Sequence, residues 1–105
     1  MTIRLSFSAL GDLQEIDGYT AHQWGAEQAD RYLAMLWDNF EKISQKPERW
    51  RLRPELHEEC RICFAGRHAI LFRIKEDHIE IGRVLHEAMD YPRHVERLFS
   101  DSGDD

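Results

Sequence analysis

Basic and imidazole side chains gather between residues 61 and 86, where they could act on a phosphodiester. The segment carries Arg61, Arg67, His68, Arg73, Arg83 and His86. Cleavage of RNA by its own 2′-hydroxyl needs a general base, a cation beside the developing charge and an acid for the leaving group. No such set is evident from the spacing, and the acids Asp101, Asp104 and Asp105 near the end of the chain would repel RNA. We therefore expect no catalytic residue.

The two cysteines form a C-x-x-C pair, Cys60 and Cys63, with His57 just upstream. A structural zinc site uses four ligands, and a redox C-x-x-C usually opens a helix. Here the pair enters a predicted strand, in which positions i and i+3 face opposite ways. We expect two ordinary thiols, no metal site and no cofactor.

Strand alternation predicts structural roles for His68 and Arg83. His68 shares its parity with apolar neighbours, which indicates a buried, hydrogen-bonded histidine. Arg83 shares the parity of Leu85 and so lies at the edge of the core, where an arginine needs an acid. Asp12 and Glu15 on the first predicted helix are the candidates. Direct contact of Arg83 with a partner is the alternative.

Other polar residues of the predicted sheet are expected at its surface. Arg67 and Arg73 have the opposite parity to His68 and should face solvent or a partner. His86 lies where the last predicted strand ends, and Met89 follows in a segment that leaves the sheet. Binding residues favour such segments, because a rigid scaffold holds them outside its core.

Length and charge limit the class of protein. The 105 residues suffice for one compact domain, expected over residues 1–99 and followed by a flexible acidic tail, 100–105. A net charge of −6 opposes attraction of nucleic acid by the whole molecule. Residues 1–60 carry 7 basic and 11 acidic side chains, whereas residues 61–97 carry 7 and 6. No apolar run approaches the roughly 20 residues that span a bilayer, so we expect a cytoplasmic protein.

Hydrophobic periodicity predicts an α+β fold of order β-α-α-β-β-β. A helical hairpin should cover one face of a mostly antiparallel sheet and leave the other face accessible. Ser8 is the expected cap of the first helix, which places Asp12 in its first turn. The expected elements are a strand at 2–7, helices at 9–24 and 26–44, an irregular connection at 47–60, strands at 61–65, 67–75 and 78–85, and a short C-terminal helix from Pro92 to near Phe99.

Three aromatic residues lie on the two predicted helices: Trp24, Tyr32 and Trp37. Core packing is the simplest expectation for all three. Tyr32 and Trp37 flank the apolar stripe of the second helix, and this makes its apolar arc wider than two packed helices need. A partner helix lying beside the hairpin would cover these two.

Several strings of residues carry a family resemblance. The chain has I-x-I-x-R-V-L-H-x-x-M-D at 79–90, preceded by G-R-H-A-I-L-F-R at 66–73, and similar strings at 8–19 and 24–36 before Pro47. Together and in this order they resemble the ParE toxins of the RelE/ParE superfamily. The resemblance implies a non-enzymatic toxin of a bacterial type II toxin-antitoxin module. Such toxins typically inhibit DNA gyrase, and a ParD-type antitoxin, whose N-terminal half binds operator DNA, neutralises them.

The resemblance also suggests roles for particular residues. An antitoxin would contact Tyr32, Trp37, Arg61, Arg67 and Arg73, because an acidic antitoxin tail complements the arginines. The target would contact His86 and Met89. Two alternatives remain: a RelE-like ribosome-dependent mRNA endonuclease on the same fold, and a degenerate toxin that binds an antitoxin without being toxic.

Overall fold

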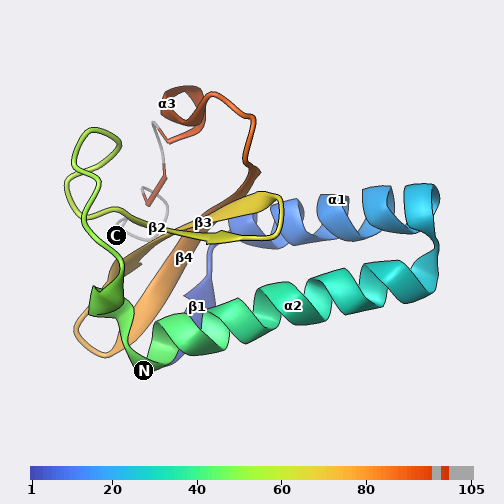
Figure 1. Ribbon diagram of the computed structural model, residues 1–105. Helices are drawn as coiled ribbons and strands as arrows, with labels where there is room; N and C mark the ends of the chain where they lie inside the picture. The colour runs from blue at the N-terminus through green and yellow to red at the C-terminus, as the bar shows by residue number, and fades with distance from the viewer. Residues whose placement is uncertain (96–97, 100–105) are drawn as a thin grey trace.

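The computed structural model describes residues 1–95 and 98–99 and confirms the predicted α+β order (Figure 1). The proposed flexible tail, 100–105, lies outside the described residues. The predicted C-terminal helix is present but shorter than expected, because it ends before Val95. The elements are β1 (Thr2–Leu5), α1 (Phe7–Trp24), α2 (Ala26–Gln45), a 3₁₀ turn (Pro47–Arg49), β2 (Arg61–Ala65), β3 (His68–Ile74), β4 (His78–His86) and α3 (Tyr91–His94).

The four strands form one mixed sheet in the order β1-β4-β3-β2. β2 and β4 run antiparallel to β3, and β1 is parallel to β4, so the sheet is mostly antiparallel, as predicted. A bulge lies in β4, because Leu71 pairs with Arg83 and Phe72 with Ile81, which leaves Gly82 without a partner on β3. One extra residue in a strand moves every side chain after it to the face opposite the one that strict alternation predicts.

The bulge corrects the predicted faces of β4. Ile81 and Val84 both belong to the core beneath the helices, whereas Leu85 belongs to the core on the opposite face. Pairing with β3 is regular from Arg83 to His86, so Arg83 keeps the strand parity of Leu85, as predicted, and the bulge at Gly82 changes only how this end of β4 is placed relative to Ile81. His86 lies on the side of Val84, where its ring meets that of His68.

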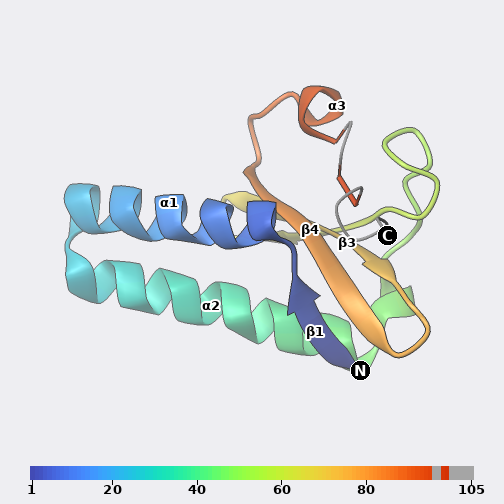
Figure 2. The same cartoon turned by 180° about the vertical axis from the view of Figure 1, so that it is seen from behind.

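α1 and α2 form the predicted antiparallel hairpin on one face of the sheet (Figure 1). Gly25 joins them with φ = 97°, in the left-handed region that glycine tolerates. Figures 1 and 2 show the tip of the hairpin projecting beyond the sheet. The hairpin core consists of Ala9, Leu13, Ile16, Leu36, Phe40, Ile43, Cys63, Ala65, Ile70, Phe72, Ile79, Ile81 and Val84. Trp24 lies at the tip and is 71% exposed, so its predicted core packing was wrong.

Ser6, not Ser8, caps the first helix. Its Oγ accepts a hydrogen bond from the backbone N–H of Ala9 at 3.0 Å and donates one to the carbonyl of Gly82 at 2.8 Å. Its own N–H donates to the carbonyl of Ile81 at 3.0 Å. The helix therefore starts two residues early, where the partner strand supplies these bonds, and Asp12 falls in its second turn rather than its first.

Asp12 joins α1 to β4, as predicted for the pair with Arg83. Its Oδ2 accepts from Arg83 Nε at 2.8 Å and from the backbone N–H of Val84 at 2.8 Å, while Oδ1 accepts from Arg83 Nη2 at 2.8 Å. Hydrogen bonding to Asp12 raises the pKa of Arg83. The carboxylate is buried and receives three hydrogen bonds, so both partners of the ion pair are satisfied.

The second face of the sheet is covered, contrary to the prediction that it stays accessible. Its core consists of Cys60, Ile62, Ala69, Leu71, Leu85, Val95, Leu98 and Phe99. A Cβ atom on Gly82 would lie 2.8 Å from side-chain atoms of both Leu98 and Phe99, so the missing side chain leaves room for the C-terminal segment. The interpretation of this segment as a simple terminal helix overlooked its role as a cover.

We predict that Arg83→Ala costs roughly 3–5 kcal/mol of unfolding free energy, because it leaves the buried carboxylate of Asp12 without its charge partner. Urea unfolding measures this cost. Arg53→Ala is the matched control: its ion pair with Glu55 lies at the surface, where the Glu55 side chain is 57% exposed, so the cost should be much smaller than for Arg83→Ala. Equal costs for the two variants would show that the Asp12 pair does not hold α1 to the sheet.

Candidate functional site

A shallow groove of about 390 Å³ lies between the two helices of the hairpin. Its lining residues are Leu10, Leu13, Gln14, Asp17, Asp30, Leu33 and Trp37. Leu10 and Trp37 are 45% and 47% exposed, although both are large and apolar. The carboxylates of Asp17 and Asp30 lie beside this apolar floor. We call these residues the hairpin groove.

Trp37 is held in a defined position at the groove. Its ring packs edge-on against Phe40, with 4.9 Å between ring centroids. One part of the indole therefore rests on the core while about half of the residue stays exposed. A fixed, half-exposed indole is typical of an interface anchor, because little side-chain entropy is lost when a partner covers it. The expectation of core packing for Trp37 was correct only in part.

Sequence reasoning missed the rest of the groove. Leu10 and Leu33 line it, and neither was predicted as a site residue. Leu10 lies off the core-facing stripe of α1, next to Phe7, which is 85% exposed. Two large apolar residues outside the core stripe, near the start of one helix, were the signal that could have identified this surface.

Tyr32, His68 and His86 meet at one end of the sheet. Tyr32 Oη lies 2.6 Å from His68 Nδ1 and accepts a hydrogen bond from the backbone N–H of Arg67 at 2.9 Å. The His68 and His86 rings follow edge-on, with centroids 5.5 Å apart. A Cβ atom on Gly66 would lie 2.7 Å from Tyr32 Oη, so the turn between β2 and β3 fits closely over the tyrosine.

The hydrogen bonds and burial favour a neutral His68. Tyr32 Oη, which accepts from Arg67, can donate its own proton to an unprotonated Nδ1 on His68. Burial, and then the neighbouring charge of His86, lower the pKa of His68. Burial also raises the pKa of Tyr32. His68 is thus the hydrogen-bonded structural histidine that the sequence predicted, and the hydroxyl of Tyr32 is its hydrogen-bond partner.

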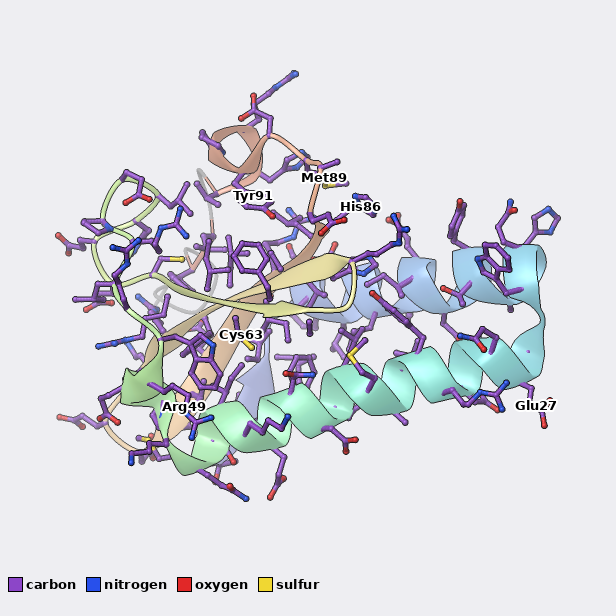
Figure 3. The ribbon with its side chains drawn as sticks, viewed as in Figure 1. Glu27, Arg49, Cys63, His86, Met89 and Tyr91 are labelled. Atoms are coloured by element: carbon purple, nitrogen blue, oxygen red, sulfur yellow. The ribbon has the colours of Figure 1, made fainter. Side chains whose placement is uncertain are left out.

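His86 and Met89 lie together where β4 ends (Figure 3). His86 Nδ1 accepts from the backbone N–H of Ala88 at 3.1 Å, and the carbonyl of His86 accepts from the N–H of Met89 at 3.0 Å. These bonds fix a tight turn that leaves Met89 44% exposed. The exposed Arg67 holds the same turn, because its carbonyl accepts from the N–H of Glu87 at 2.8 Å.

Arg73 is buried, and the expectation that it faces solvent was wrong. Its Nε donates to Glu80 at 2.8 Å and its Nη1 to Glu59 at 3.1 Å, while the guanidinium lies 4.4 Å from the ring centroid of Phe99. The reason is the C-terminal cover on this face of the sheet. Arg61 is half-buried and donates to the carbonyl of Trp50 at 2.6 Å.

Cys60 and Cys63 are buried free thiols on opposite faces of the sheet, as strand spacing predicts. Burial raises the pKa of Cys60 to about 12 and that of Cys63 to about 11. Both therefore stay protonated at neutral pH and are poor nucleophiles.

None of the helices in the described part of the chain has the length and apolar character that a membrane-spanning helix needs.

Comparison with known proteins gives consistent results. A family model described as the ParE toxin of the type II toxin-antitoxin system parDE matches residues 3–91. Toxin ParE1 of Caulobacter vibrioides is 35% identical over 92 residues, which cover 88% of this chain and 95% of that protein. Toxin ParE1 of Mycobacterium tuberculosis is 34% identical over 92 residues, which cover 87% of this chain and 94% of that protein.

The fold is also similar to a solved structure, described as the chromosomal ParDE TA system from P. aeruginosa. The TM-score is 0.73 at 20% sequence identity, and the match covers 82% of this chain and 95% of the other. At this identity the likeness concerns the fold alone. The family model and the ParE1 relatives, which match most of the chain, establish the family. The chain belongs to the ParE toxin family of type II toxin-antitoxin systems.

Proposed function

We propose that this chain is a cytoplasmic toxin that inhibits DNA gyrase by binding and that a ParD-type antitoxin neutralises it. Membership of the ParE family supports the proposal most directly. Operator DNA would be contacted through the antitoxin. Catalysis is not needed, because a toxin that holds its target in one conformation acts by differential binding to two states.

The state of the basic residues supports binding rather than RNA cleavage. Arg83 is engaged by Asp12, and Arg73 by Glu80. His68 is hydrogen-bonded to Tyr32 and has a lowered pKa. A RelE-like enzyme would need comparable groups on one accessible surface, free to take up a proton and to meet a phosphate. In this chain Arg73, Arg83 and His68 are instead engaged in contacts within the fold.

The hairpin groove is the antitoxin site that the structure supports best. Its half-exposed indole and leucines fit the apolar side of an antitoxin helix, and its carboxylates fit basic residues flanking that side. This differs from the expectation of an acidic antitoxin segment on the sheet arginines. Arg67 is exposed and remains available for such a segment, whereas Arg61 and Arg73 are already bonded within the chain.

The target site proposed for His86 and Met89 rests on their position. Both are at the surface where β4 ends, on a turn that backbone hydrogen bonds make rigid. Met89 offers an adaptable apolar contact, and His86 a polar one beside it. Figure 3 shows the two residues together where β4 leaves the sheet, and neither lines the hairpin groove, so antitoxin and target would contact different residues.

We predict that Trp37→Ala weakens antitoxin binding by about 1–3 kcal/mol, because the indole is the anchor of the hairpin groove. Isothermal titration calorimetry with the purified antitoxin measures the loss. Trp24→Ala is the matched control, since it removes another exposed helical tryptophan from the tip, outside the groove. The control should bind like the unchanged chain. Undiminished affinity of a folded Trp37→Ala variant would remove the groove from the antitoxin interface.

We predict that His86→Ala combined with Met89→Ala abolishes most gyrase inhibition while the fold and antitoxin binding persist. Met89 is exposed and His86 is half-buried, and neither belongs to either hydrophobic core. A supercoiling assay measures inhibition, and thermal melts confirm folding. Asp90→Ala, which changes an exposed neighbour, serves as the control. Full inhibition by the folded double variant would place the target site elsewhere, and a wild-type chain without effect on gyrase would contradict the proposed function.

A further inference from the structure

The most basic segment of the chain lies outside the sheet. Five of the 14 lysines and arginines fall between residues 42 and 53, where Glu48 is the only acid, although the whole chain carries a net charge of −6. The net charge of residues 1–60 hides this segment, because the two helices before it are acidic. A binding partner responds to the local charge instead, because charges more than about 8 Å apart are largely screened at physiological salt.

Four of these cations are exposed: Lys42, Lys46, Arg49 and Arg51. None makes an ion pair within the described part of the chain. Arg53 differs, because it is bonded to Glu55 at 2.7 Å. Lys42 lies in the last turn of α2 and Lys46 directly follows the helix, where its N–H donates to the carbonyl of Lys42 at 3.3 Å. We call these four residues the basic surface.

The basic surface rests on a rigid base. Pro47 is buried, and the N–H of Arg49 donates to the carbonyl of Lys46 at 3.1 Å. The Trp50 ring packs edge-on against Phe72, with centroids 6.0 Å apart. On the outer side, the guanidinium of Arg49 lies 5.7 Å from the Trp50 ring centroid. The cations are therefore presented by a fixed turn rather than by a loose loop.

Stabilisation of the helix explains only part of this cluster. Cations in the last turn of a helix interact favourably with its dipole, which accounts for Lys42 and Lys46. Arg49 and Arg51 lie beyond α2, where the effect has faded. Figure 3 places Arg49 at the C-terminal end of α2 and the acidic Glu27 at its other end, so the two ends of the hairpin differ in charge.

The chemistry of the surface favours a phosphate backbone over a protein partner. A protein interface needs an apolar or aromatic anchor at its centre. Here the neighbouring Pro47 is buried and Trp50 is packed against Phe72, and only Leu52 adds an exposed apolar side chain. Binding to phosphates needs only clustered lysine and arginine.

We propose that the basic surface is a contact site for the phosphodiester backbone of duplex DNA. The contact would be independent of sequence, because cations at phosphates position a duplex without reading its bases. It goes beyond the proposed inhibition of gyrase and does not rest on it. The surface gives this acidic chain a local, directional attraction to DNA, whereas the acidic tip of the hairpin is repelled.

Fluorescence anisotropy of a labelled duplex at about 50 mM salt, without gyrase, tests the proposal. The unchanged chain should bind weakly, with an affinity that falls steeply as salt is raised. Lys46→Gln combined with Arg49→Gln should lower the affinity about tenfold or more and reduce the salt slope by about 2. The matched control, Arg31→Gln with Arg93→Gln, removes the same charge from exposed positions elsewhere and should bind like the unchanged chain.

Three results would overturn the proposal: no binding by the unchanged chain, equal loss in both double variants, or no loss in the Lys46 and Arg49 variant. An acidic peptide of matched charge, used as a second probe, addresses a protein partner. Preference for that peptide over the duplex would also contradict the proposal. Since gyrase is absent, the result is independent of whether the chain inhibits gyrase.

Discussion

The buried carboxylate of Asp12 is the constraint on which the arrangement of the molecule depends. β1 pairs with β4 only as far as Ile81, so the rest of that strand edge has no neighbouring strand. Ser6 and Asp12 on α1 supply the missing hydrogen bonds, and Arg83 neutralises the carboxylate. Backbone groups left unpaired at this edge would each cost roughly 1–3 kcal/mol. The same bonds therefore complete the sheet and fix the direction of the hairpin.

Two surfaces follow from that fixed direction. With α1 held at β4, the groove around Trp37 lies between the two helices and stays open to solvent. At the end of β4, His86 pairs with His68 across the two strands, and Tyr32 lies 2.6 Å from His68 Nδ1. His68 is used in this contact and Arg83 in the pair with Asp12, which is consistent with a toxin that acts by binding.

Much of the fold was predictable, because periodicity and turn residues determine it locally. The bounds of β2 and the antiparallel hairpin at Gly25 agree with the structure. What could not be predicted depends on distant partners. Ser6 caps α1 because Gly82 accepts its proton, and Arg73 is buried because Phe99 covers it. The sequence strings indicated the family, whereas the groove and the basic surface could be recognised only from the exposure of their residues.

The most direct test of the account is to express the chain alone in bacteria and to follow DNA synthesis and protein synthesis separately, with co-expressed antitoxin as the control. We expect DNA synthesis to stop first, with accumulation of DNA breaks linked to gyrase and with both effects suppressed by the antitoxin. Immediate arrest of protein synthesis with codon-specific cuts in mRNA would contradict the account and indicate a RelE-like enzyme. Unchanged growth at high expression would indicate a degenerate toxin.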